Sequence, residues 1–137
     1  MNKNQTDLFG SKKSDDWATP EWLYRELDDE FHFDFDPCPL NSTFNGLELP
    51  WNGSIFANPP YSKVKQFLIK AHNEIENGNA HTVVFLVFAN TDTAWFHDYV
   101  LGKCEIRFLR GRVKFVGVSK AGAMRPSIIC IFRKDDK

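Results

Sequence analysis

The sequence predicts an α/β fold in which a largely parallel sheet is flanked by helices, with an antiparallel hairpin at the C-terminal end. Two observations carry this prediction. Helical and strand-like hydrophobic patterns alternate along the chain, and residues 82–88 form an apolar run typical of a parallel strand covered on both faces. The chain has 137 residues, of which 42% are hydrophobic, which suits one domain with one core. We expect this domain to span residues 15–137, behind a polar leader, 1–14, that is expected to be disordered.

The first elements are a helix and a short strand. Apolar residues recur at helical spacing near 20–30, with Thr19 as the expected cap and Pro20 in the first turn. Residues 33–36 alternate phenylalanine and aspartate and predict a strand that stops at Pro37, so that Asp36 stands at a strand's carboxyl end. In open α/β sheets ligands bind at such ends.

A long loop separates this strand from the next strand and helix. Residues 38–53 are rich in loop-forming types, and Leu49 and Trp51 are expected to hold the loop against the body. Residues 54–57 predict a second strand. Residues 62–76 carry an apolar stripe and predict an amphipathic helix that ends just before Gly78.

The second half is expected to complete the sheet. A helix is predicted over 93–100, followed by three strands at 104–109, 113–118 and 127–133. The last two strands are expected to form a hairpin around Gly122. The sheet would then have an antiparallel edge.

Charge is distributed unevenly although the formal net charge is only -1. Between Asp15 and Glu48 the acids greatly outnumber a single base, Arg25, whereas between Lys103 and Lys134 the bases greatly outnumber a single acid, Glu105. We expect any DNA to bind the basic segment. The alternative is that these are solvated charges beside a strand pair.

The cysteines and the apolar runs limit the class of protein. The three cysteines, Cys38, Cys104 and Cys130, lack metal-type spacing, so buried free thiols are expected rather than a disulfide framework or a zinc site. No apolar run approaches the ~20 residues of a membrane helix. A soluble intracellular protein is therefore expected.

The most informative motif is Asn58-Pro59-Pro60-Tyr61, which directly follows the strand predicted at 54–57. The two prolines keep the loop extended and rigid. The Asn58 side-chain oxygen and the Pro59 carbonyl can each accept one hydrogen of an amine, which favours a pyramidal, nucleophilic nitrogen. Tyr61 offers a flat face on which a nucleobase can stack. The alternative is a rigid turn without chemistry.

This tetrad resembles the amine-methylation motif of amino-methyltransferases, and residues 16–134 are similar in order and spacing to phage DNA adenine methyltransferases of the Dam type. The resemblance implies transfer of a methyl group from S-adenosylmethionine to the exocyclic amine of adenine in DNA. It implies catalytic roles for the whole tetrad, Asn58, Pro59, Pro60 and Tyr61. It implies cofactor contacts from the opening segment, the first cofactor motif and the tetrad, namely Trp17, Thr19, Pro20, Asp36, Pro37, Cys38 and Asn58.

The resemblance also extends to the basic segment. Residues 111–115 resemble a late motif near the target base, so Phe115 is expected to stack opposite Tyr61. Arg125 opens the segment that resembles the last strand and is a candidate phosphate contact. The expected contacts to the DNA backbone are Arg110, Arg112, Lys114, Lys120 and Arg125.

Between the central strand and the basic segment, the residues that match the family are expected to be mainly structural. Trp95 and Phe96 are expected to belong to the core, and His97 is expected to be structural. The resemblance further implies a cytoplasmic enzyme, in the host cell if a phage encodes it, that acts as a monomer or weak dimer without a metal.

One departure from larger methyltransferases leaves alternatives open. Their second acid, which grips the cofactor ribose, has no counterpart here, so either residues 41–48 supply ribose contacts or cofactor affinity is low. The tetrad alone also allows methylation of RNA adenine or of a protein glutamine. A degenerate domain that binds nucleic acid without turnover is the remaining alternative.

Overall fold

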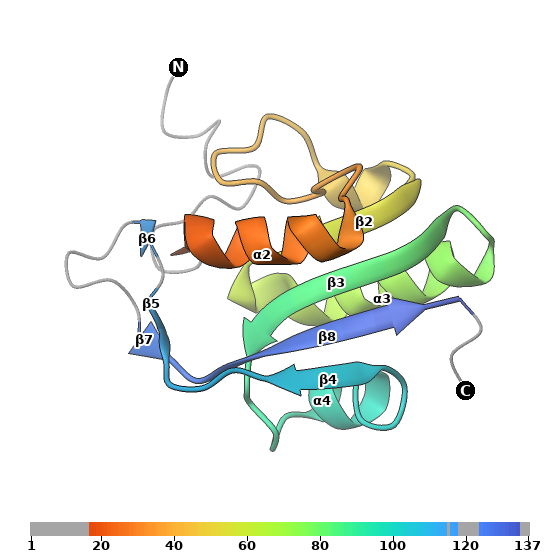
Figure 1. The fold of residues 1–137 in the computed structure, drawn as a ribbon. Helices are drawn as coiled ribbons and strands as arrows, with labels where there is room; N and C mark the ends of the chain where they lie inside the picture. Colours follow the sequence, from red (N-terminus) through yellow and green to blue (C-terminus); the bar gives the residue numbers. More distant parts are fainter. Residues whose placement is uncertain (1–16, 115, 118–123, 135–137) are drawn as a thin grey trace.

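The computed structural model describes residues 17–114, 116–117 and 124–134 (Figure 1). The leader predicted at 1–14 lies outside the described residues. A four-stranded sheet has the order β2-β3-β8-β4. Its strands are Gly53–Ala57 (β2), Ala80–Phe88 (β3), Ser127–Arg133 (β8) and Glu105–Phe108 (β4). The prediction of an α/β fold with helices flanking the sheet is confirmed, but the sheet is not largely parallel, because only β2–β3 of its three pairings is parallel.

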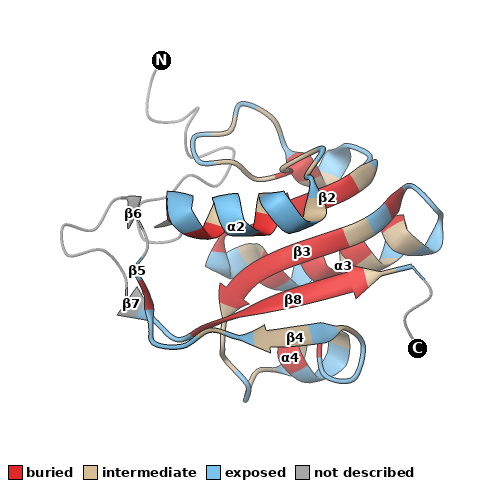
Figure 2. Cartoon of the chain, in the orientation of Figure 1, coloured by how far each residue is buried: buried red, intermediate tan, exposed pale blue. Residues whose placement is uncertain are grey.

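The antiparallel strand lies inside this sheet. β2 and β3 are parallel, whereas β8 runs antiparallel to both of its neighbours, β3 and β4. The prediction of an antiparallel edge is therefore wrong. The physical reason is apolarity on both faces of β8, whose residues from Ser127 to Phe132 are all buried, as its colour in Figure 2 shows. β4 is less buried than β8 and lies at the edge of the sheet.

Helices cover both faces of the sheet (Figure 1). On one face α2, Glu21–Phe31, packs Leu23 and Leu27 against alternate residues of β3, including Val84 and Leu86. On the other face lie α3, Val64–Glu76, and α4, Ala94–Tyr99, over the remaining residues of β3 and β8. The sheet is thus the middle of three layers, as expected for residues 82–88.

The strand predicted at 33–36 is reduced to a single parallel bridge between Phe35 and Ile55. Local side-chain bonds compete with further pairing. The Asp34 carboxylate accepts a hydrogen bond from the amide of Ser54 at 2.9 Å, and Asp36 accepts one from the amide of Cys38 at 2.9 Å. Asp36 nevertheless lies beside β2, near its carboxyl end.

Two further pairings are short. β5, Val113–Lys114, pairs antiparallel with β7, Met124–Arg125, and β1, Trp17–Ala18, pairs antiparallel with β6, Val116–Gly117. The hairpin predicted between 113–118 and 127–133 is therefore wrong in its partners. β8 continues into the main sheet because its apolar side chains are buried there.

Two local predictions also fail. Pro20, rather than Thr19, is the N-cap of α2, because the Thr19 hydroxyl is engaged by Asn58. Leu49 is 38% exposed, and Trp51 alone of the expected pair is buried, with its indole N–H donating to the Gly46 carbonyl at 2.9 Å. Gly46 opens a short 3-10 turn, Gly46–Glu48, within the loop.

Candidate active site

The tetrad lies where the sequence places it, directly after β2. Pro59 and Pro60 are buried, and a short 3-10 turn, Tyr61–Lys63, leads from them into α3. The Tyr61 side chain is 46% exposed. The prolines thus fix the loop to the body while Tyr61 remains accessible.

Asn58 is shared by two cavities. Its Nδ2 donates to Oγ1 of Thr19 at 3.0 Å. This bond orients the amide, so that Oδ1 is the atom turned away from Thr19. The larger cavity contains Asn58 and Asp36, and the smaller one contains Asn58 and Tyr61.

The larger cavity, of about 320 Å³, brings together residues far apart in the sequence. Its lining comprises Ala18, Thr19, Glu21, Tyr24, Asp36, Cys38, Pro39, Leu40, Phe56 and Asn58. Four of the seven predicted cofactor contacts therefore meet in one place. Pro20 and Pro37 are buried beside it rather than in its lining, and the side chain of Trp17 lies outside what the structure describes.

Glu21 and Tyr24 of this cavity were not found from the sequence. They lie three residues apart on α2 and so share a helix face, but that spacing is common to all helices. Burial, followed by the carboxylates of Asp28 and Asp36, raises the pKa of Tyr24 above its ordinary value, so its hydroxyl stays protonated. The cavity therefore combines carboxylates with aromatic surface.

The smaller cavity, of about 10 Å³, is formed around the tyrosine of the tetrad. Its lining comprises Asn58, Pro59, Tyr61, Val64, Leu86, Val87, Phe88 and Trp95. Two groups hold the Tyr61 ring: Phe88, with ring centroids 5.8 Å apart, and Asn90, whose amide donates to the Tyr61 hydroxyl at 3.3 Å. Trp95 is half-buried and lines this cavity, so the expectation of a purely core residue is only partly right.

Phe88 also contacts the basic segment. The guanidinium of Arg125 lies 5.2 Å from the centroid of the Phe88 ring. Sequence reasoning missed both Phe88 and Asn90. The available signal was the position of Phe88 as the last residue of a strand whose carboxyl end adjoins that of β2.

A third cavity, of about 20 Å³, lies under the loop after Asp36. Loop residues between Pro37 and Leu47 line it together with Pro60, Lys63 and Phe67. Cys38 and Pro39 line both this cavity and the larger one. The loop thus offers concave surface next to the predicted cofactor residues.

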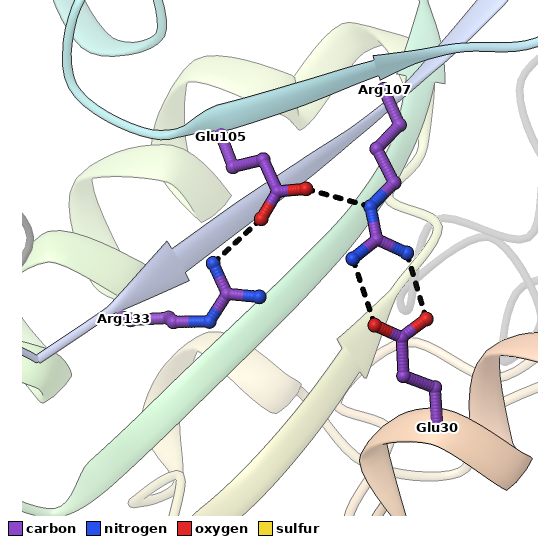
Figure 3. A network of polar contacts seen from close by, with 4 residues as sticks. All are labelled: Glu30, Glu105, Arg107 and Arg133. Carbon is purple, nitrogen blue, oxygen red and sulfur yellow. Dashed lines mark hydrogen bonds and ion pairs between the residues drawn. The ribbon is translucent and has the colours of Figure 1, made fainter.

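Part of the basic segment is engaged in ion pairs (Figure 3). Arg107 on β4 binds Glu30 of α2 through two bonds of 2.7 and 2.8 Å, and also binds Glu105 at 2.8 Å. Glu105 in turn accepts from Arg133 of β8 at 2.7 Å. Hydrogen bonds from Arg107 lower the pKa of the Glu30 and Glu105 carboxyls. Arg107 and Arg133 are therefore neutralised locally.

The remaining predicted contacts differ from this network. Arg110, Arg112, Lys114 and Arg125 are exposed, and none of the four has a carboxylate partner within residues 17–114, 116–117 and 124–134. Phe115 and Lys120 lie outside the described residues. Arg107 and Arg133, which were not predicted contacts, are held in ion pairs instead.

The other residues singled out from the sequence have structural roles. Phe96 is buried in the core, as expected, and a ring nitrogen of His97 donates to the Thr91 carbonyl at 2.7 Å. The three cysteines are free, but only Cys130 is buried, so the expectation of buried thiols is right for one of them. The described part of the chain contains no cluster of three metal-ligating side chains, and none of its helices is long and apolar enough to cross a bilayer.

Comparison with known proteins is consistent with this site. The sequence profile of the family described as DNA N-6-adenine-methyltransferase (Dam) matches residues 6–136. The DNA N-6-adenine-methyltransferase of Haemophilus phage HP1 (strain HP1c1) is 31% identical over 132 residues. That alignment covers 85% of this chain and 73% of the phage protein.

Proposed function

Because this chain belongs to the Dam family of DNA N-6-adenine-methyltransferases, we propose that it methylates the exocyclic amine of adenine in DNA with S-adenosylmethionine as methyl donor. The observation that carries the proposal is that Asn58 lines both the cavity of Asp36 and the cavity of Tyr61. We assign residues 15–137 to a single minimal Rossmann-like methyltransferase domain.

The larger cavity fits the methyl donor by size and by chemistry. Its volume of about 320 Å³ lies at the lower end of the usual range of small-molecule sites. Asp36 places a carboxylate where an ammonium group gains from negative charge, and Tyr24 and Phe56 supply aromatic surface. The other carboxylate of the lining, Glu21, is ion-paired with Arg25. S-adenosylmethionine, when bound, supplies a methyl carbon attached to a positively charged sulfur. The proposed donor site is completed by Thr19, Cys38 and Asn58, which also line the larger cavity.

Polar groups of the loop beside the larger cavity support ribose contacts from the loop over low cofactor affinity. The third cavity adjoins the larger cavity through Cys38 and Pro39 and carries polar groups from Ser42, Asn45 and Lys63. We therefore place the nucleoside part of the donor toward residues 38–47. In this proposal, contacts from the loop take the place of the second acidic motif of larger methyltransferases.

The tetrad acts on the amine of the base. In this proposal Oδ1 of Asn58 and the Pro59 carbonyl each accept one amine hydrogen, which localises the nitrogen lone pair for attack on the methyl carbon. The N–C bond forms as the S–C bond breaks, and the surplus amine proton leaves to water. Tyr61 stacks on the base, which must leave the duplex to reach the cavity.

DNA is proposed to bind across the exposed basic side chains near the β5–β7 pair. Arg110, Arg112, Lys114 and Arg125 project from this region without acidic partners among the described residues. Phe115 and Lys120 are retained in the proposal from the resemblance alone. We propose that a monomer or weak dimer suffices, because both cavities are formed by one chain.

The test is methyl transfer by Asn58→Ala. With labelled donor and unmethylated plasmid DNA, transfer should collapse, while donor binding, measured by calorimetry, should fall far less because the other residues of the larger cavity remain. Asn73→Ala, an exposed asparagine on α3, is the matched control and should retain wild-type turnover. Unchanged turnover in Asn58→Ala would remove the tetrad from the chemistry.

The same assay separates the alternatives. Parallel incubations with RNA and with protein acceptors rank the acceptor class directly. The absence of donor binding at high concentration would favour a binding module without turnover. Transfer to DNA above both other acceptors is the expected result.

A further inference from the structure

The strongest remaining observation is a contact chain between the base site and the basic segment. Phe88 contacts the Tyr61 ring at 5.8 Å between centroids and the Arg125 guanidinium at 5.2 Å from its own centroid. Neither Phe88 nor its contact with Arg125 has a role in the mechanism described above. Phe88 is thus the link between an exposed cation and the residue on which the base is proposed to stack.

The sheet register determines this contact. Phe88 is paired with Ser127 in the antiparallel β3–β8 ladder, and the Ala89 amide continues the pairing to the Pro126 carbonyl at 2.9 Å. Arg125 precedes Ser127 by two residues and so projects on the same face as Ser127, which brings it diagonally over Phe88. The contact is therefore fixed by backbone pairing rather than by a chance meeting of flexible side chains.

The Arg125 guanidinium, stacked on the Phe88 ring, can still bind a ligand through its edge. A guanidinium that lies over an aromatic ring uses its face, while its N–H groups point outward in the guanidinium plane. Those N–H groups suit a phosphate. Arg125 is exposed and has no carboxylate partner in the described part of the chain, unlike Arg107 and Arg133.

We propose that Phe88 is a positioning residue that fixes Arg125 beside Tyr61, so that Arg125 binds a backbone phosphate of the nucleotide whose base stacks on Tyr61. The inference rests on the proposed function and deepens it. Phosphate binding and base stacking then form one unit, which holds a single nucleotide at two points. Asn90 completes the unit by holding the Tyr61 hydroxyl.

The test is the salt dependence of kcat/KM for methyl transfer to unmethylated plasmid DNA. Loss of one phosphate contact reduces the slope of log(kcat/KM) against log[salt] by about 1. Arg125→Gln should show this reduction. Phe88→Leu removes no charge, yet it should reduce the slope to nearly the same extent, with a higher KM for DNA and unchanged donor binding.

Matched variants separate positioning from general damage. Phe31 is also a half-buried phenylalanine under a guanidinium, that of Arg107, but it lines none of the three cavities. Phe31→Leu is therefore the control, and its salt slope should equal that of the wild type. Phe88→Tyr keeps the ring and should restore the wild-type slope. The salt slope of the double variant Phe88→Leu/Arg125→Gln should be no smaller than that of Arg125→Gln alone.

A surface variant keeps the inference testable if Phe88→Leu does not fold. Arg125→Lys retains the charge but loses the planar stacking group, so its slope should fall toward that of Arg125→Gln. A wild-type slope in Phe88→Leu or in Arg125→Lys overturns the inference. Equilibrium binding of a fluorescently labelled duplex gives the same slopes without turnover, so failure of the proposed methyl transfer is recognised separately.

Discussion

The amide nitrogen of Asn58 donates to the hydroxyl oxygen of Thr19 at 3.0 Å across 39 residues of sequence. This bond connects the segment before α2 to the loop after β2. It fixes the orientation of the amide whose oxygen is proposed to bind the adenine amine. We therefore propose that Thr19 positions Asn58, and Thr19 also lines the larger cavity.

Thr19→Val should lower kcat, because it removes this acceptor while keeping the shape of the side chain. A hydrogen bond of about 1 kcal/mol corresponds to roughly a fivefold loss. Thr19→Ser keeps the hydroxyl and should retain most of the activity, with donor affinity measured in parallel by calorimetry. Equal losses in the two variants would contradict a role for the hydroxyl.

Tyr61→Ala should mainly raise the KM for DNA. Stacking of a base on an aromatic ring contributes ~1–3 kcal/mol, which corresponds to roughly 5- to 150-fold in affinity. Tyr61→Phe and Asn90→Ala each break the bond between the Tyr61 hydroxyl and Asn90. If this bond is the only coupling, the double variant should be no worse than the more impaired single variant; additive losses would show separate roles.

Arg112→Gln should lower the affinity for DNA and reduce the salt slope of binding by about 1, because Arg112 is exposed and has no acidic partner among the described residues. Arg133→Gln is the matched control. Arg133 is already paired with Glu105, so its loss should change the slope much less. Fluorescence anisotropy with a labelled duplex at several salt concentrations measures both, and equal slope changes would refute the distinction.

Glu74 should contribute an acid-sensitive part of the stability. Burial raises the pKa of this carboxyl, but hydrogen bonds from the Trp51 amide and Asn79, together with Lys70, bring it below its ordinary value. A lowered pKa in the folded state means that the contribution is fully present above the ordinary glutamate pKa. It is lost as pH falls through the lowered value.

Denaturant unfolding of the wild type and Glu74→Gln between neutral pH and acid measures this contribution. The difference in the free energy of unfolding should be largest at neutral pH and shrink in acid. Glu74→Ala should cost about 1–3 kcal/mol more than a surface change, because the Trp51 amide loses a buried acceptor at 2.7 Å. A difference between wild type and Glu74→Gln that is independent of pH would contradict the assigned origin.

Gly53→Ala should destabilise the start of β2 for two reasons. Gly53 has φ of 90°, and a Cβ there would lie 2.2 Å from Oδ2 of Asp34, which accepts the Ser54 amide. Gly102→Ala is the control, since its φ is 76° but no atom lies within 4 Å of a Cβ. Both should lose about 1–3 kcal/mol from backbone strain, and Gly53→Ala more, as measured by thermal unfolding.

The tetrad and the flanking strand and helix were predictable because their determinants are local. Two consecutive prolines end β2 after Ala57, and the apolar stripe of α3 begins within a few residues. The burial of β3 was predictable for the same reason, since continuous apolarity requires cover on both faces. Asp36 could be placed near the site by the rule that strand ends gather ligands.

The position of β8 and the contacts of the basic segment were not predictable, because they depend on distant partners. The sequence pattern of an apolar strand is the same whether the strand lies at an edge or between two neighbours. Only the pairing of β8 with both β3 and β4 decided its position in the sheet. Charge counts likewise cannot show that Glu30 of the acidic half binds Arg107 of the basic half.

The sequence by itself determined the backbone of the loop at residues 58–61, because proline restricts its own φ and the backbone of the preceding residue wherever the chain goes. Only the tertiary structure decided what surrounds that loop. Thr19 contacts the loop through a side-chain hydrogen bond, and Phe88 contacts it through the Tyr61 ring. The strand register then brings Arg125 over Phe88, although the segments involved are far apart in the chain. Such contacts form only when the whole core is packed, so no local pattern in the sequence encodes them.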